Sequence, residues 1–201
     1  MPAKKESGWV PVRALLLDEQ LPRSGARTFS AVVADAGTQT AYRALRSLDP
    51  AQVAASLPVL RVAGQLRELV ARGSGRVASG ARQDFGRAFL PIAEEPGTEF
   101  VVGMIGKFMT ASQLEYRQFD PPDFAGFAEP GYGKVAVGFL VLPYGEKRSL
   151  LCSETRTVTT DPLSARQFRR YWRVVGPFAG YVMRHWLMLA KQRAEREQGG
   201  G

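Results

Sequence analysis

Few residues in this sequence have the chemistry that catalysis or metal binding needs. His185 is its only histidine and Cys152 its only cysteine. A metal site with two histidines is therefore excluded, and a cysteine–histidine nucleophile pair could be made only from these two residues. Because Cys152 lies among apolar residues of a strand pattern, we interpret it as a packing residue. The sequence has no glycine-rich nucleotide-binding loop, and we expect neither a metal nor a cofactor.

Three residues are candidates for acid–base chemistry. For each of them we favour a structural role over a catalytic one. Glu154 and Arg156 are two positions apart in a strand pattern, so they face the same side and are expected to form an ion pair on the outer face of a sheet. A register shifted by one residue would turn both inward, where an acid–base role could be argued. His185 is expected to be partly exposed and hydrogen-bonded, with a role as acid or base as the alternative.

The elements that position these residues follow from the spacing of apolar residues. A first strand is expected at 28–36, then two or three short helices, one of which begins at Asp49-Pro50, and then a loop at 73–84. Further strands are expected at 85–95, 98–108, 112–119, 134–143 and 148–161, with Pro96-Gly97 as a turn and an irregular connection at 120–133. This order predicts an α+β fold: a curved antiparallel sheet wrapped around a long C-terminal helix.

The predicted C-terminal helix, residues 164–198, carries a broad aromatic stripe. Its apolar residues are spaced alternately by four and three positions: Phe168, Trp172, Val175, Ala179, Val182, Trp186 and Leu189. A bend is expected at Gly176-Pro177, because proline removes a backbone donor from the helix. From the residues alone, this stripe either fills a solid core or closes a cavity against the curved sheet.

Three motifs give the chain a resemblance to a known superfamily. They are "AEEPGTEFVVGMIGKF" (93–108), "FAGFAEPGYGKVAVGF" (124–139) and "SETRTVTTDPLSARQFRRYWRVVGPFAGYVMRHWL" (153–187). With them the chain resembles the START-like helix-grip superfamily, also called SRPBCC, which includes lipid-transfer domains and polyketide cyclases, and within it an uncharacterised bacterial branch. The resemblance covers a START-like domain at 28–196. Residues 1–27 mix proline, glycine and charged residues and are expected to form an extended arm with one helical turn, and 197–201 a disordered tail.

The same resemblance implies a hydrophobic cavity between the sheet and the C-terminal helix. Its ligand would be small and mostly hydrophobic, lipid-like or polyketide-like, and the protein a carrier or sensor; a cyclase-like or dehydratase-like enzyme is the alternative. The expected lining residues are Phe100, Val102, Met104, Phe108, Val135, Val137, Phe139, Leu151, Ser153, Thr155, Phe168, Trp172, Val175, Val182 and Trp186. The hydroxyls of Ser153 and Thr155 would suit a ligand with one or two polar groups.

The charge of the chain suggests a second kind of partner. The formal net charge is +8 at pH 7, and Arg166, Arg169, Arg170 and Arg173 concentrate basic side chains on the C-terminal helix. Exposed charged helix faces are usually only solvated; beyond that, we rank an anionic membrane surface above nucleic acid, because no nucleic-acid-binding motif is visible. A basic surface module without a ligand is a further alternative.

No run of residues approaches the ~20 apolar residues of a membrane span, and the N-terminus lacks a signal-peptide core, so we expect a cytoplasmic protein. The sequence leaves the oligomeric state open.

Overall fold

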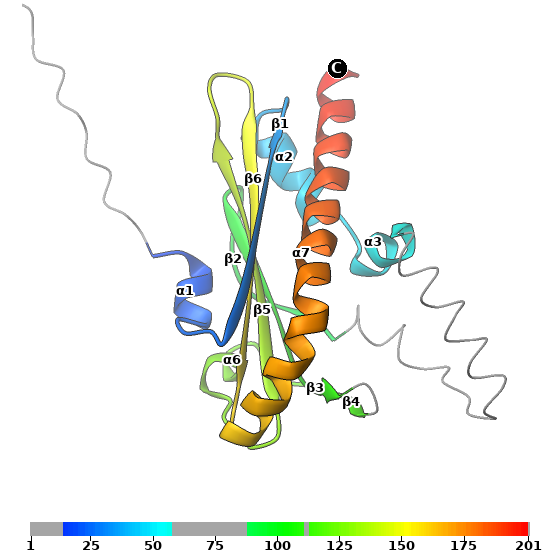
Figure 1. Cartoon of the computed structure of the whole chain (residues 1–201). Helices are drawn as coiled ribbons and strands as arrows, with labels where there is room; N and C mark the ends of the chain where they lie inside the picture. Colours follow the sequence, from blue (N-terminus) through cyan, green and yellow to red (C-terminus); the bar gives the residue numbers. More distant parts are fainter. Residues whose placement is uncertain (1–13, 58–87, 111–112, 201) are drawn as a thin grey trace, which may run out of the picture.

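A computed structural model describes residues 14–57, 88–110 and 113–200 of the chain (Figure 1). The loop predicted at 73–84 and the start of the predicted arm lie outside the described residues. The described elements, in chain order, are α1 (Leu16–Gln20), β1 (Ala26–Ala34), α2 (Thr38–Arg46), α3 (Pro50–Ser56), β2 (Leu90–Glu95), β3 (Glu99–Thr110), β4 (Gln113–Arg117), α6 (Asp123–Gly126), β5 (Gly133–Pro143), β6 (Ser149–Thr159) and α7 (Pro162–Gly199).

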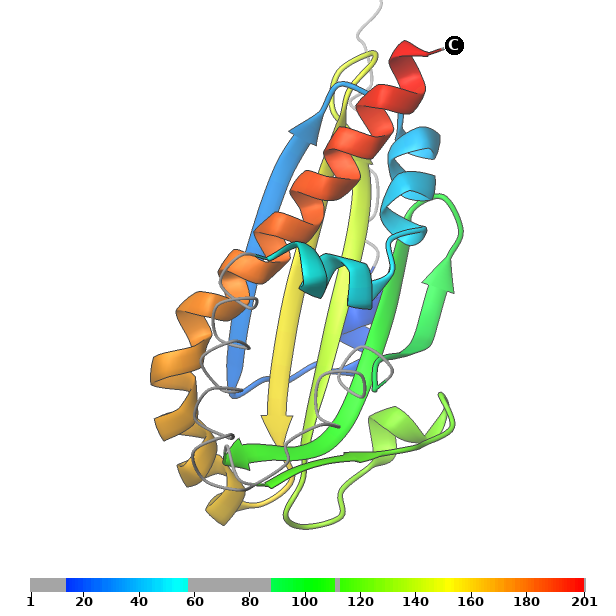
Figure 2. The same ribbon diagram turned by 90° about the vertical axis from the view of Figure 1, so that its right-hand side faces the viewer.

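The strands form one six-stranded antiparallel sheet. Their order is β1-β6-β5-β3-β2, and β4 pairs with the second half of β3. The sheet is curved, and α7, α2 and α3 lie on its concave side while α1 lies behind it (Figure 2). The predicted α+β fold of the helix-grip type is therefore confirmed, including the short helices after the first strand. Among the described helices, none combines the length and the apolar composition that crossing a membrane requires.

The turn between β2 and β3 is the one that the Pro96-Gly97 pair predicts. Gly97 has a φ of +86°, which lies in the left-handed region that residues other than glycine rarely adopt. The connection predicted to be irregular, 120–133, contains the short helix α6, and it packs down on the sheet through Phe124 and Tyr132, which are both buried. Its aromatic residues therefore belong to the core of the protein.

The long helix α7 begins at a well-formed cap. The Asp161 carboxylate accepts hydrogen bonds from the backbone N–H and the hydroxyl of Ser164, at 2.9 and 2.6 Å, and from the N–H of Gly131 at 2.7 Å. These bonds lower the pKa of Asp161 to about 2, with the Ser164 hydroxyl as the largest cause. The carboxylate thus stays ionised at neutral pH and joins the start of α7 to the connection before β5.

The helix α7 continues past Pro177 without a break in its assignment and ends at Gly199. Its axis changes direction in the first half of the helix, the half that contains Pro177 (Figure 2). The helix also extends into the segment predicted as a disordered tail. Arg193 forms an ion pair with Glu197 at 3.2 Å, four residues on, and such pairs support the last turns of a helix.

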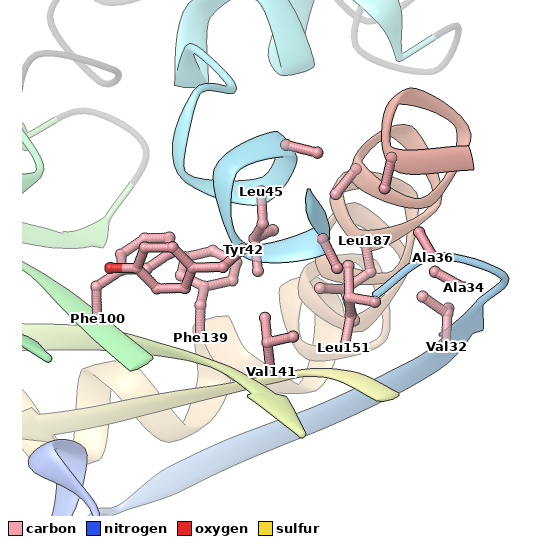
Figure 3. Close-up of a cluster of buried hydrophobic side chains, with 14 of the residues drawn as sticks. Val32, Ala34, Ala36, Tyr42, Leu45, Phe100, Phe139, Val141, Leu151 and Leu187 are labelled. Carbon is pink, nitrogen blue, oxygen red and sulfur yellow. The ribbon is translucent and has the colours of Figure 1, made fainter. Parts of the chain in front are cut away.

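Both faces of the sheet are covered by apolar side chains. On the concave face, α2 and α7 pack on a cluster that includes Val32, Phe139, Val141 and Leu151 (Figure 3). On the convex face, a second cluster joins α1 and α6 to the sheet through Leu17, Leu21, Val101, Ile105, Phe124, Tyr132 and Ala136. The sheet is thus the middle layer of a three-layer arrangement, and α7 covers only one of its faces.

Polar contacts hold α1 against the convex face. The guanidinium of Arg156 donates to the carboxylate of Asp18 at 2.7 Å and to the carbonyl of Leu21 at 3.0 Å. The N–H of Leu16 donates to the buried carboxylate of Glu99 at 3.1 Å. The described part of the segment 1–27 therefore contains one short helix and packs on the protein's own sheet: Leu17 of α1 and Leu21 just after it are buried, and buried charges on the sheet need the partners that this segment supplies.

We expect Leu17→Ala to lower the free energy of unfolding by about 2 to 5 kcal/mol, because it empties a buried site against Gly138. Leu163→Ala is the matched control, since Leu163 is 65% exposed and its loss should change stability by less than about 0.5 kcal/mol. Urea denaturation measures both. Equal, small effects would show that α1 does not dock on the sheet.

Candidate functional site: the concave face under α7

The register of the central strands decides which side chains point towards α7. Leu151, Ser153 and Thr155 of β6 lie opposite Val141, Phe139 and Val137 of β5 and opposite Val32, Ser30 and Thr28 of β1. On β3, Phe100, Val102 and Met104 continue the same face. Because Leu151, Val32 and Phe139 pack with Leu187 of α7, this is the concave face.

Four hydroxyl-bearing residues cross this face from β1 to β6: Thr28, Ser30, Ser153 and Thr155, which we call the hydroxyl band. The hydroxyl oxygens of Thr28, Ser153 and Thr155 are buried and have no hydrogen-bond partner among the described residues. Ser30 has only a long contact, 3.4 Å, to the carbonyl of Gly180 on α7. Buried hydroxyls are nearly always hydrogen-bonded, so three unpartnered ones on one face are an unusual concentration.

A fourth unpartnered group belongs to α7 itself. The indole N–H of Trp186 is buried and, within the described part of the chain, has no acceptor. Its ring packs on Phe139, with ring centroids 5.4 Å apart, and Phe139 lies opposite Ser153 in the sheet. Trp186 and Ser153 therefore flank the same phenyl ring from the helix and from the neighbouring strand.

An aromatic row continues from Trp186 across the face. Phe139 stacks on Phe100 at 4.8 Å, and Phe100 meets the edge of Tyr42 at 6.0 Å, as the rings in Figure 3 show. Beyond the hydroxyl band, towards the start of α7, a further apolar cluster contains Ala88, Met104 and Phe168, with Trp172 packed against it. The band is thus a polar section between two apolar clusters under one helix.

Near the hydroxyl band, α7 carries small residues. A Cβ added to Gly180, whose carbonyl faces Ser30, would meet no described atom within 4 Å. A Cβ on Gly176 would lie 2.9 Å from the indole nitrogen of Trp172, so this glycine lets the Trp172 ring lie against its own helix.

Most residues predicted to line a cavity do lie on this face. Phe100, Met104, Val137, Phe139, Leu151, Ser153, Thr155 and Phe168 are buried there; Val102, Val135, Trp172 and Trp186 are half-buried and packed against the clusters. Val182 is half-buried. The side chains of Phe108 and Val175 lie outside the described residues. The cavity itself stays a prediction.

The three acid–base candidates are not brought together. Glu154 and Arg156 lie on the convex face, where the guanidinium donates to Glu154 at 2.8 Å. The ion-pair interpretation is confirmed, and the inward alternative is wrong, because the pairing of β6 with both neighbours turns the hydroxyls inward instead. His185 is half-buried, hydrogen-bonded to Ser56 of α3 at 2.8 Å and stacked on Tyr181, as a structural histidine would be. Cys152 is buried, and burial raises the pKa of its thiol, which keeps it protonated.

Sequence reasoning missed one polar cluster at the margin of the face. The hydroxyl of Tyr42 donates to Glu94 at 2.6 Å, and Arg46 donates to the same carboxylate at 3.1 Å. Burial, followed by the bond to Glu94, raises the pKa of Tyr42, while the bond from Arg46 holds the pKa of Glu94 below its usual value. The residues come from α2 and β2, and no local pattern could have paired them.

Sequence reasoning also missed Thr28, Ser30 and the indole N–H as parts of the site. The alternation in "TFSAVVA" does place Thr28, Ser30 and Val32 on one face of a strand, so a signal was present. What the pattern lacked was the partner strand: only the pairing of β1 with β6 puts Thr28 beside Thr155 and Ser30 beside Ser153.

Comparisons with known proteins assign no family and no function to this chain. No model of a known protein family matches the sequence, and no curated protein matches it significantly. Solved structures with a similar arrangement include TTHA0849 from Thermus thermophilus, at 11% identity and TM-score 0.35, covering 84% of this chain and 97% of that one. The Zhui aromatase/cyclase from a Streptomyces species has 14% identity and TM-score 0.35, covering 85% and 94%.

The di-domain ARO/CYC protein BexL is similar at 13% identity and TM-score 0.33 over 85% of this chain and 50% of its own. Identities and TM-scores of this size establish neither a shared ligand nor a shared activity. The candidate site therefore stands on its own geometry.

Two serines of β6 provide a matched test of the unpartnered hydroxyls. Ser149 and Ser153 face the same side of the strand and are 0% and 1% exposed, but only Ser149 has a described partner, the carbonyl of Ala36 at 2.6 Å. We expect Ser149→Ala to lower the free energy of unfolding by about 1 to 3 kcal/mol. Ser153→Ala should instead raise it by about 1 kcal/mol in ligand-free protein, because a desolvated hydroxyl is removed. Urea denaturation of both variants distinguishes them, and equal losses would mean that the Ser153 hydroxyl is satisfied.

Proposed function

We propose that the protein binds a small, mostly apolar molecule between the concave face of the sheet and α7, as a carrier or sensor. The observation that carries the proposal is the set of buried, unpartnered polar groups at Thr28, Ser153, Thr155 and Trp186 within an otherwise apolar face. A ligand that supplied their hydrogen-bond partners would give these residues a use that packing alone does not.

The energetics favour a binding site over a solid core. Burial of a hydroxyl without a partner costs about 1 to 3 kcal/mol, and three lie together on this face. A ligand would offset that cost and would add about 25 cal/mol for each Å² of apolar ligand surface that it buries, before the cost of ordering. The aromatic row formed by Trp186, Phe139 and Phe100 offers apolar surface beside the hydroxyls.

The cyclase-like alternative needs an acid or base beside the ligand. Glu154 and Arg156 lie on the opposite face of the sheet, and His185 is bonded to α3. Hydroxyls and an indole N–H orient a ligand but do not take up a proton near neutral pH. Binding without turnover is therefore the function that the described residues support best.

Native mass spectrometry of gently purified protein, followed by organic extraction, tests this proposal. We expect a bound apolar molecule on the wild-type chain that is lost in Ser153→Leu, because the larger side chain fills the hydroxyl band. Phe29→Ala is the control: Phe29 lies opposite Glu154 on the convex face and is 62% exposed, so this variant should keep the ligand. Bare protein both after purification and after incubation with a total lipid extract would contradict the proposal.

We also propose an anionic membrane surface as the partner of the outer face of α7. Arg166, Arg169, Arg170 and Arg173 are exposed, and none forms an ion pair with a described residue. The helix has no carboxylate before Glu195. Leu163 and Tyr181 are 65% and 48% exposed on the same helix, and apolar side chains beside arginines suit a lipid surface better than a nucleic acid.

Co-sedimentation with vesicles tests the membrane proposal. Binding to phosphatidylcholine vesicles that contain phosphatidylserine should fall on the order of a hundredfold in the triple variant R166Q/R170Q/R173Q, at roughly 1 kcal/mol for each basic residue. The variant R23Q/K147Q/R148Q removes the same charge from exposed sites elsewhere and should bind like wild type. Equal loss in both variants, or preference for duplex DNA over vesicles, would contradict it.

A further inference from the structure

The unpartnered groups fall at two positions on the concave face. Thr28 and Thr155 lie directly opposite each other in the β1–β6 pair and form the first position. Ser153, which lies opposite Phe139 in the β5–β6 pair, forms the second, and Trp186, whose ring packs on Phe139, supplies a separate donor. Ser153 and Thr155 are two residues apart on one strand, so the two positions are separated by about 7 Å.

The chemistry of these groups specifies the polar part of a ligand. A hydroxyl can donate or accept a hydrogen bond, but the indole N–H of Trp186 can only donate. The Trp186 N–H therefore needs a ligand atom with a free lone pair, such as the oxygen of a carbonyl or hydroxyl. Both hydroxyl positions can be satisfied by groups of the same kind.

The surroundings specify the charge of the ligand. The charged residues of β5 and β6, Lys134, Glu154 and Arg156, all point to the convex face: Lys134 donates to carbonyls of α6, and the other two form their ion pair. At the margin of the concave face, Glu94 and Arg46 neutralise each other. Among the described residues, no charged side chain is left to pair with a ligand at the hydroxyl band, and an unpaired buried charge is far more costly than an unpaired hydroxyl.

We propose that this site selects an uncharged ligand with two hydroxyl or carbonyl oxygens about 7 Å apart, and that it rejects carboxylates such as fatty-acid anions. The inference rests on the proposed function and adds the ligand class to it. Recognition comes from Thr28 and Thr155 at one oxygen and from Ser153 at the other, with the indole N–H of Trp186 as a further donor beside the aromatic row. The apolar part of the ligand lies along the aromatic row.

Three probes of one shape test the inference by isothermal titration calorimetry: naphthalene, naphthalene-2,7-diol and naphthalene-2,7-dicarboxylate. We expect the diol to bind wild-type protein about tenfold more tightly than naphthalene, because two neutral hydrogen bonds are gained. The dicarboxylate should bind more weakly than naphthalene. In S153A/T155V the advantage of the diol should disappear while the affinity for naphthalene is kept; Ser149→Ala, verified as folded, should behave like wild type.

The indole N–H resonance of Trp186, assigned with Trp186→Phe, gives an independent readout and should shift with the diol but much less with naphthalene. The ligand class would be overturned if naphthalene bound as tightly as the diol, or if the dicarboxylate bound as tightly as naphthalene. Either result would leave the proposed function standing. If none of the three probes binds and the purified protein carries no ligand, both proposals are overturned.

Discussion

Strand β6 pairs with β5 along its whole length and with β1 over residues 149–157, and this double pairing determines which face each of its residues takes. A shift by one residue would bring Glu154 and Arg156 under α7 and turn Ser153 and Thr155 towards α1. It would place a charged pair in an apolar face, at a cost above the ~1–3 kcal/mol of an unpartnered hydroxyl. The candidate site and the contacts that hold α1 therefore depend on the same register.

The two faces of the sheet differ in whether their buried polar groups have hydrogen-bond partners. On the convex face, the buried cations Arg156 and Lys134 are each given several partners from α1, β6 and α6. On the concave face, hydroxyls and an indole N–H are left without described partners among aromatic rings. The buried cations of the convex face have partners within the protein, so this face serves as a structural layer. The concave face has buried hydrogen-bonding groups without described partners, and it is therefore suited to bind another molecule.

The helix α7 differs in the same way between its two halves. Its second half packs closely on β1 through Leu187, Ala190 and Ala194, and two ion pairs join Lys191 to Glu195 and Arg193 to Glu197. Its first half contains the bend near Pro177 and the arginines without ion pairs. The stable half anchors the helix, and the groups available for a ligand or a surface lie from the middle of the helix towards its start.

Local sequence patterns predict the fold class, the order of strands along the chain and the start of α3 at Asp49-Pro50. These features depend on periodicity and turn chemistry between residues close in sequence, which a pattern can show. Tertiary packing was needed to place α1 on the convex face, to bring Tyr42 to Glu94 and to join Thr28 and Ser30 to Ser153 and Thr155. It also turns Leu187, Ala190 and Ala194 of α7 inward, whereas Val182 and Leu189 of the predicted stripe are half-buried. Each of these results pairs residues at least 50 positions apart or chooses between two registers, and that choice is made by the packing of the whole sheet rather than by any one segment.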